Sequence, residues 1–456
     1  MTDTIARLIS PRLPYLWLVL AVALLAAISN VAGEDILKRL AAMDDTPFAP
    51  ALAALCLFAL CSFASFYATH GTPLPSFVVA IALGMAGHTL FQPIVSNTTA
   101  LSSLVTVSAA LILFGGGLEM PLSEFLRLLV KILLLAVPGV LVTGYAFSAV
   151  LGGLGPALGF ALPAAVIILL GGILASTDPA AIIPVLENLR FKRPAAKDIV
   201  IAESALNDVV GTLLTAALFK LPLAALTLTA AYAALATPED FQFLARQTGY
   251  GVLFGLGGFA LLWILARIKR RHAAGYGADQ VYFLAAPIIA FVGSTALGGS
   301  GFLAAFFAGL LFHAEEHMAE IERFFYQVID GVAKPVIFLL VGAMVDIHAL
   351  IAYAPLGIAA GLIFMFVLRP AMVFLMLGIY ALFPDSPRGL SVRELLFISF
   401  VRETGAIPAV LLVTVVARMT TPVNGLVEVG MWVILLTLVL APPFTPFVAR
   451  RLGIAE

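Results

Sequence analysis

The stretch from Ile199 to Phe219, IVIAESALNDVVGTLLTAALF, determines the fold class of this chain. It is long enough to cross a membrane as a helix, because about 20 apolar residues span the hydrocarbon core. Its polar and small residues recur at helical spacing and therefore share one face; they are Glu203, Ser204, Asn207, Asp208, Gly211, Thr212 and Thr215. A carboxylate in the hydrocarbon core costs at least about 2.5 kcal/mol and is normally paired or functional. We therefore expect this helix to line a water-filled cavity or an ion pathway.

The composition of the whole chain supports the same fold class. Of its 456 residues, 62% are hydrophobic and only 11% are charged, which predicts an all-α polytopic membrane protein. The stretch 221–236, between two prolines, is ambiguous and is not counted as a span. The apolar segments of spanning length are 14–32, 48–68, 76–95, 100–119, 128–151, 160–189, 199–219, 249–268, 281–297, 298–313, 326–346, 354–382, 394–416 and 427–449.

Lysine and arginine are distributed unevenly between the loops. With the loops numbered alternately, 18 of the 25 basic residues fall on the side that holds both termini and 5 fall on the other side. The remaining two, Arg369 and Arg402, lie inside segments. An excess of Lys and Arg marks the cytoplasmic side, so we predict a multi-pass protein of the cell inner (plasma) membrane with both termini cytoplasmic. The minority side holds Lys38, Arg39, Lys220, Arg246 and Arg418.

The chain also resembles itself at an offset of roughly 226 residues, and such repeats are typical of secondary transporters. Leu113–Met120 falls on Leu339–Asp346, and Gly84 falls near Gly309. The six helices of the first unit and the connecting helix make seven, an odd number, so the second unit is expected to enter the membrane from the opposite side and to be inverted. The predicted organisation is an extra N-terminal transmembrane helix and loop (1–47), a first six-helix repeat (48–220), a linker with a connecting transmembrane helix (221–280) and a second six-helix repeat (281–450).

Two of the segments carry polar breaks near their centres. Segment 160–189 is interrupted at Ala175–Pro179, where Asp178 before Pro179 is typical of a helix N-terminus. Segment 394–416 carries the sequence Arg402-Glu403-Thr404-Gly405, followed by Pro408. Non-helical backbone at membrane depth is tolerated only where it lines a cavity or is buried in protein. We therefore predict an inverted-repeat secondary transporter in which two discontinuous helices cross at mid-membrane.

These motifs together resemble the cation/proton antiporter superfamily, and within it the NhaP-like branch of sodium/proton exchangers. The resemblance runs from about Pro73 to Pro446. It rests on Thr177-Asp178-Pro179, on Glu203-Ser204 with Asn207-Asp208, on Leu368-Arg369-Pro370, and on the stretches 114–119, 300–304 and 308–310.

The resemblance implies a set of site residues. Asp208 would bind either the cation or a proton, and Ser204 and Thr177 would supply further oxygens to the ion, as a hard cation such as Na+ requires. Arg369 would hold Glu203 and Asn207, and Asp178 would belong to the transport machinery. An Asn-Asp pair in place of an Asp-Asp pair implies one proton exchanged per monovalent cation. The transported ion (Na+, Li+ or K+) would be the only ligand, with no cofactor, and a homodimer without nucleic-acid partners is expected.

The second broken helix departs from the family pattern, which often reads Gly-Leu-Arg-Gly. Glu403 is the added carboxylate there, and it could pair with Arg402 or alter coupling beside Thr404. Glu119 is the nearest match to a further family carboxylate, although it lies at a helix end. The residues His313, Glu316, His317 and Glu320 could form a metal-binding helix face, but no second motif supports such a site.

Burial of Asp208 in an apolar bundle favours its neutral form, so that a proton and a cation compete for it near neutral pH. Exchange then follows if the loaded carrier crosses the membrane and the empty, charged carrier does not. Three alternatives stay open at this stage: a potassium/proton antiporter, a sodium-coupled symporter of an organic anion, and a channel. No catalytic Ser/His/Asp set or metal motif is evident on facing segments, so we do not expect an enzyme.

Overall fold

The structure is a computed structural model that describes residues 13–42, 48–69, 76–177, 186, 189–271, 278–312, 318–384, 386, 389–419 and 424–456. Within these ranges ten helices are long and apolar enough to cross a membrane, or eleven if one bent pair counts as a single span. Three shorter apolar helices accompany them: Ala164–Leu174, Gly301–Leu311 and Ala406–Arg418. The prediction of an all-α polytopic membrane protein is therefore confirmed.

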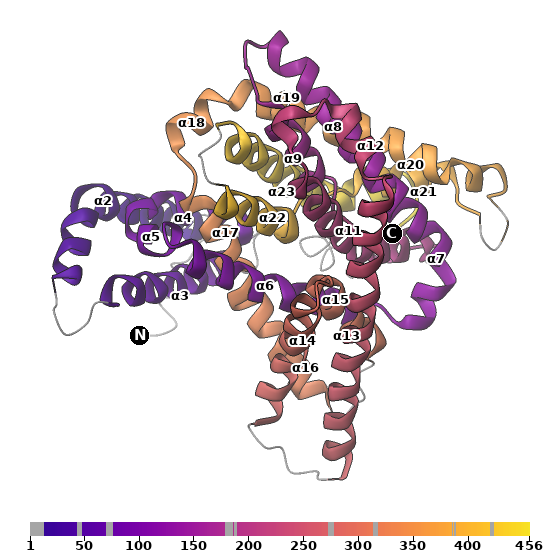
Figure 1. Cartoon of the computed structure of the whole chain (residues 1–456), viewed down its shortest axis with the longest axis horizontal. Coiled ribbons are helices and arrows are strands. Elements are labelled where there is room, and N and C mark those ends of the chain that lie inside the picture. The colour runs from indigo at the N-terminus through magenta and orange to yellow at the C-terminus, as the bar shows by residue number, and fades with distance from the viewer. Residues whose placement is uncertain are drawn as a thin grey trace.

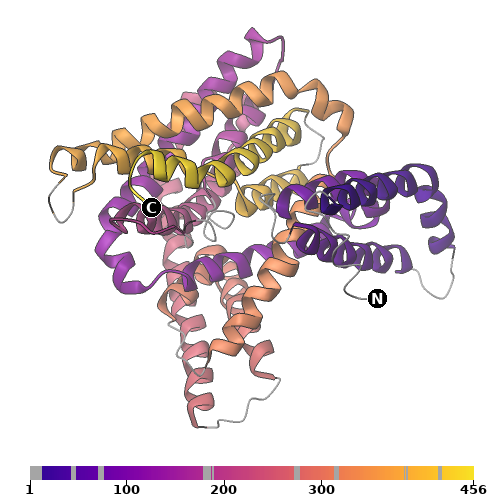
Figure 2. The same ribbon diagram turned by 180° about the vertical axis from the view of Figure 1, so that it is seen from behind.

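The N-terminal helices form a lobe beside the rest of the molecule, and α13, α14 and α16 project from a second side (Figure 1 and, from behind, Figure 2). Helices α9, α11, α15, α17 and α22 lie towards the middle. The helices are α2 (Leu13–Ala41), α3 (Ala49–Thr69), α4 (Ser76–Ala86), α5 (His88–Val95), α6 (Thr98–Leu118), α7 (Leu122–Ala136), α8 (Pro138–Ala157), α9 (Ala164–Leu174), α11 (Ala195–Lys220), η2 (Leu223–Ala225), α12 (Leu228–Ala234), α13 (Pro238–Arg271), α14 (Ala278–Ala296), α15 (Gly301–Leu311), α16 (Ala319–Val328), η4 (Ile329–Ala333), α17 (Lys334–Ala343), α18 (Ile347–Ala352), α19 (Ala354–Ile363), η5 (Phe364–Leu368), α20 (Arg369–Leu377), η6 (Gly378–Leu382), α21 (Val392–Phe400), α22 (Ala406–Arg418) and α23 (Leu426–Arg451).

Four glycines let two pairs of helices approach backbone to backbone, as small residues do in membrane bundles. A Cβ atom at any of them would lie closer than 3.0 Å to a carbonyl oxygen of the facing helix. Corresponding residues of the two helix pairs are each 225 positions apart in the chain. The contacts are Gly84 with Leu339 and Gly342 with Ile81 between α4 and α17, and Gly309 with Phe114 and Gly117 with Phe306 between α6 and α15.

The predicted span 76–95 is not one straight helix. It divides into α4 and α5, which meet at an angle of 91°. The break falls at Gly87, where a Cβ atom would come within 2.6 Å of the Phe91 ring. The apolar run of the sequence predicted the span, but it could not show this bend, since each half on its own is helical and apolar.

Segment 354–382 is also irregular, and the irregularity positions a buried charge. A π-helical turn, η5, precedes Arg369 and Pro370. Proline has no N–H and clashes with the carbonyl four residues earlier, and a wider turn relieves both problems. Arg369, at the start of α20, is only 1% exposed and points into the protein.

The last residues of the chain pair with the loop that leads into α11. Phe191 forms an isolated antiparallel bridge with Ala455. Backbone hydrogen bonds run from the Lys192 N–H to the Ile454 carbonyl (2.9 Å) and from the Glu456 N–H to the Arg190 carbonyl (3.0 Å). The Phe191 ring also packs edge-on against Phe397 of α21, with the ring centroids 5.5 Å apart. The C-terminal residues are thus attached to the segment immediately before the polar helix.

Candidate ion-binding site

The polar stripe of α11 lies inside the protein and not against lipid. Six of its side chains are at most 4% exposed: Glu203, Ser204, Asn207, Asp208, Thr212 and Thr215. A polar group without partners costs several kcal/mol in such surroundings. The hydrogen-bond partners of these side chains therefore define what the site can do.

The first partner is the non-helical backbone that follows α9. The Ser204 hydroxyl donates to the Thr177 carbonyl oxygen (2.6 Å), and its oxygen is 3.0 Å from the Thr177 hydroxyl oxygen. Gly211 allows this close approach, because a Cβ atom there would be 2.7 Å from the Cβ of Ser176. The helix α9 ends at Leu174, so the carbonyls of the following residues are not used by a continuing helix. Ser204 and Thr177 together present several oxygen atoms beside α11.

The second partner is Arg369. Its guanidinium donates through Nη1 to Glu203 Oε1 (2.8 Å) and through Nη2 to Glu203 Oε2 (2.6 Å), and both side chains are 1% exposed. This two-pronged geometry is the strong form of an arginine–carboxylate pair. The Asn207 Nδ2 donates to Glu203 Oε1 (3.0 Å) and to Thr177 Oγ1 (3.1 Å). Asn207 thus joins the ion pair to the oxygens beside Ser204.

Asp208 follows Asn207 directly and lies one helical turn after Ser204, on the same face. It is 4% exposed. The structure therefore brings Asp208, Ser204 and Thr177 into one buried region, with the Glu203–Arg369 pair one turn away. Hydroxyl, carbonyl and carboxylate oxygens are the donor set that suits a hard monovalent cation.

The break between α21 and α22 lies next to the end of α9. Residues 401–405 are non-helical between α21 and α22. Arg402, 1% exposed, donates through Nη2 to the carbonyls of Leu174 (3.0 Å) and Ala175 (3.2 Å) at the end of α9. Its guanidinium also stacks 3.9 Å from the centroid of the Phe364 ring. The positive charge therefore stabilises the negative end of the α9 dipole.

Of the other predicted residues, two lie in the break between α21 and α22 and one lies at the surface. Glu403 and Thr404 are buried within the same non-helical stretch, and the Thr404 N–H donates to Thr437 Oγ1 (3.0 Å). Arg402 binds the α9 carbonyls, and its suggested pairing with Glu403 stays a prediction. Glu119 is exposed at the C-terminal end of α6 and does not join the buried set.

Some of the predicted residues lie outside the described part of the chain. Asp178, with the helix start predicted there, is one of them. So are His313, Glu316 and His317 of the weak metal-face hypothesis. Among the residues that the structure describes, no cluster of three His, Cys, Asp or Glu side chains could hold a metal ion.

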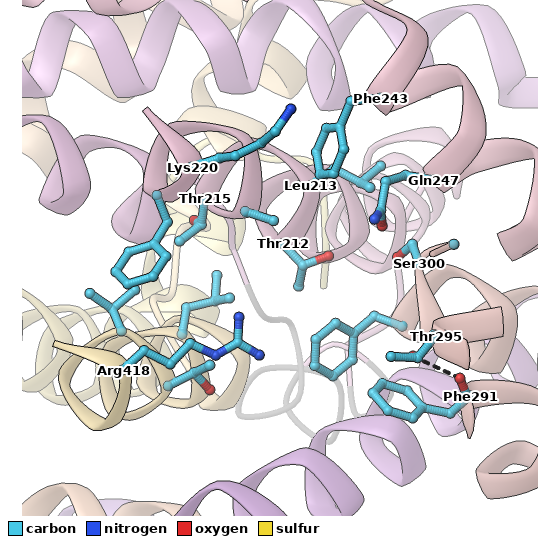
Figure 3. Close-up of a pocket in the computed structure, with 18 residues that line it drawn as sticks. Thr212, Leu213, Thr215, Lys220, Phe243, Gln247, Phe291, Thr295, Ser300 and Arg418 are labelled. Atoms are coloured by element: carbon cyan, nitrogen blue, oxygen red, sulfur yellow. Dashed lines mark hydrogen bonds between the residues drawn. The ribbon is translucent and has the colours of Figure 1, made fainter. Parts of the chain in front are cut away.

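A cavity of about 400 Å³ adjoins the polar stripe and was not predicted from the sequence (Figure 3). Thr212 and Thr215 of α11 lie on its wall, together with residues of α13, α14, α15 and α22. The side chains of Lys220 and Arg418 also line it. Lys220 and Arg418 both belong to the small set of basic residues on the minority side of the charge distribution. Their place in that set is the one feature of the sequence that pointed to this region.

Comparison with known proteins identifies the relatives of this chain. Residues 51–451 match the model of the family described as sodium/hydrogen exchanger, transmembrane. The chain is 28% identical over 349 residues to the K(+)/H(+) antiporter NhaP2 of Shewanella baltica, covering 75% of this chain and 56% of the relative. It is 27% identical over 344 residues to the K(+)/H(+) antiporter NhaP of Alkalimonas amylolytica, covering 74% and 55%. The chain thus spans about half the length of the curated relatives it matches.

The solved structure of the sodium proton antiporter MjNhaP1 from Methanocaldococcus jannaschii is similar in fold. The two superpose with a TM-score of 0.66 at 21% identity, covering 89% of this chain and all of the other. At this identity the similarity concerns the fold, and it agrees with the fold class predicted from the sequence.

Proposed function

This chain belongs to the sodium/hydrogen exchanger family, as its motifs predicted, and on that premise we propose that it exchanges a monovalent cation for protons across the membrane. The observation that carries the proposal is the buried group of Asp208, Ser204 and Thr177 beside two helix breaks. Such a group offers a cation oxygen ligands and offers a proton one carboxylate. The exchange would be electroneutral, since Asp208 is preceded by Asn207 and not by a second carboxylate.

Competition for Asp208 accounts for the coupling. A cation binds the ionised carboxylate with help from the oxygens of Ser204 and Thr177, and a proton neutralises the same carboxylate when the cation leaves. The carrier with an empty, charged Asp208 is penalised in the apolar interior, so it does not cross. Only the two loaded forms cross, and movement of one ion therefore requires return of the other.

The surrounding charges hold the site and do not carry ions in this scheme. The Glu203–Arg369 pair is satisfied on both carboxylate oxygens, so neither partner is available to a cation. Asn207 links that pair to Thr177, because its side-chain amide donates hydrogen bonds to both Glu203 and Thr177. Arg402 fixes the end of α9. We retain Asp178 in the transport set on the sequence motif alone.

The identity of the cation has two candidates. The motifs favour Na+, with Li+ as a second substrate, and the similar solved structure is of a sodium proton antiporter. Two relatives of higher identity are named K(+)/H(+) antiporters. Oxygen ligands alone do not fix the cation size, so K+ is the alternative to be tested beside Na+.

We further propose that the two halves of the chain are inverted repeats, with the boundaries predicted from the sequence. The two glycine contacts, α4 with α17 and α6 with α15, support this because corresponding residues share one offset of 225. The charge distribution supports an inner-membrane protein with both termini cytoplasmic. A homodimer is proposed from the family resemblance.

The test uses inside-out membrane vesicles that hold a proton gradient, with a pH-sensitive dye. Na+, Li+ and K+ are added in turn to vesicles with wild-type protein, Asp208→Asn or Asp208→Ala. The proposal expects dye recovery with at least one cation for the wild type and none for either variant, at equal amounts of folded protein. Recovery with K+ alone assigns the potassium exchanger. Recovery by the Asp208 variants, or no recovery by the wild type from pH about 6 to 9, would refute the mechanism.

A further inference from the structure

The cavity beside α11 continues the polar stripe beyond Asp208. Thr212 and Thr215 follow Asp208 by about one and two helical turns, which places Thr215 roughly 10 Å along the helix axis. Thr215 is 3% exposed, and its hydroxyl has no hydrogen-bond partner among the described residues. Gln247, Thr295 and Ser300 add polar atoms on the opposite wall. This wall would hydrate an ion on its way to Asp208.

Two positively charged side chains, Lys220 and Arg418, line this cavity, and their surroundings differ. The Lys220 ammonium is 3.3 Å from Asp240 Oδ1 and lies 4.3 Å from the centroid of the Phe243 ring, so its charge is compensated. Arg418, the last residue of α22, is exposed and takes part in none of the ion pairs between residues that the structure describes. Figure 3 shows its guanidinium directed into the cavity, towards the face of α11 that carries Thr212 and Thr215.

An uncompensated positive charge is unexpected on a path for cations. A cleft with low-dielectric walls focuses the field of the charges that line it, so one guanidinium lowers the local cation concentration. For a cation roughly 10 Å from the guanidinium, Coulomb's law with effective dielectric constants between about 80 and 20 corresponds to about a two- to seventeenfold change in cation affinity. The charge would therefore set the concentration range in which this face of the carrier loads.

We propose that Arg418 is an electrostatic filter at the non-cytoplasmic mouth of the ion path, which weakens cation loading from that side. The inference rests on the proposed function and on the orientation given by the charge distribution. Arg418 acts through its field and does not bind the ion, so it is a specificity-determining residue of the path and not a ligand. The filter makes loading unequal on the two sides of the membrane.

The experiment compares wild type, Arg418→Gln and Arg418→Lys in right-side-out and inside-out vesicles, with the external cation varied and a pH dye as the readout. Arg418→Gln should lower the apparent KM for the transported cation about two- to seventeenfold in right-side-out vesicles only. Arg418→Lys keeps the charge and should keep the wild-type KM. The difference between wild type and Arg418→Gln should shrink when choline chloride raises the ionic strength from about 0.01 M to about 0.3 M, because screening shortens the range of the field.

Several results would overturn the filter. The first two are an unchanged KM in Arg418→Gln and a KM change of equal size in right-side-out and inside-out vesicles. The others are a KM in Arg418→Lys equal to that of Arg418→Gln, and a KM difference between wild type and Arg418→Gln that does not depend on ionic strength. Absence of exchange by the wild-type protein with every cation is a separate outcome, and it would refute the proposed function itself.

Discussion

Replacement of Arg369 by methionine tests the buried ion pair most directly. The change keeps an apolar side chain of similar length, but it leaves Glu203 buried without its partner. Both side chains are 1% exposed and the two hydrogen bonds measure 2.8 and 2.6 Å, so solvent cannot replace the lost charge. Breaking a buried pair on one side costs about 3–5 kcal/mol. We expect Arg369→Met to lower the free energy of unfolding by that amount.

The assay is denaturant unfolding of the purified protein in detergent micelles, followed by intrinsic fluorescence. The double variant Glu203→Gln/Arg369→Met removes both charges and should recover most of the loss, since no bare charge remains buried. The matched control is Lys38→Met, which breaks the exposed Lys38–Glu34 pair at 3.2 Å with partners 73% and 77% exposed. It should change stability by less than about 0.5 kcal/mol. A loss below about 1 kcal/mol for Arg369→Met, or a double variant no more stable than the single one, would contradict the reasoning.

Two further predictions concern stability. Gly309→Ala should destabilise the protein by about 1–3 kcal/mol, because the added Cβ atom would overlap the Phe114 carbonyl. The control is Gly257→Ala in α13, where nothing lies within 4 Å of the added atom. It should be neutral or stabilising by about 0.5–1 kcal/mol in the same unfolding assay. Asp346 caps α18, and hydrogen bonds from the N–H groups of His348 and Ala349 lower the pKa of its carboxyl group. Its ionised form therefore stabilises the fold in full above the ordinary carboxyl pKa. This contribution is lost as the pH falls through the lowered pKa. The difference in unfolding midpoint between wild type and Asp346→Ala should therefore be full at pH about 6 and smaller at pH about 3; a difference that grows on acidification would contradict this sign.

The sequence predicted the helical architecture well because the signal is local. Apolar length and helical spacing identify a span and its polar face without knowledge of what packs against it. The stripe on α11 was predicted in this way, residue by residue, and the structure buries it as expected. The break at residues 401–405 was also visible, since charged residues in an apolar segment have few explanations.

The contacts between distant segments could not be predicted from local patterns. The pairing of Arg369 with Glu203 came from the family resemblance alone. The partner of Arg402 was missed, because it is a pair of backbone carbonyls more than 220 residues earlier in the chain, at Leu174 and Ala175. Backbone carbonyls carry no side-chain signature. The cavity with Arg418 was missed for a related reason, since its walls come from five separate helices, α11, α13, α14, α15 and α22.

The backbone bridge at the C-terminus has a mechanical consequence. Residues 454–456 are bonded to residues 190–192, and α11 begins only a few positions later, at Ala195. A force applied through residues 454–456 would therefore be transmitted to the loop that leads into α11. The same geometry makes this position a sensor: a fluorophore there should report strain in the loop before α11 during turnover.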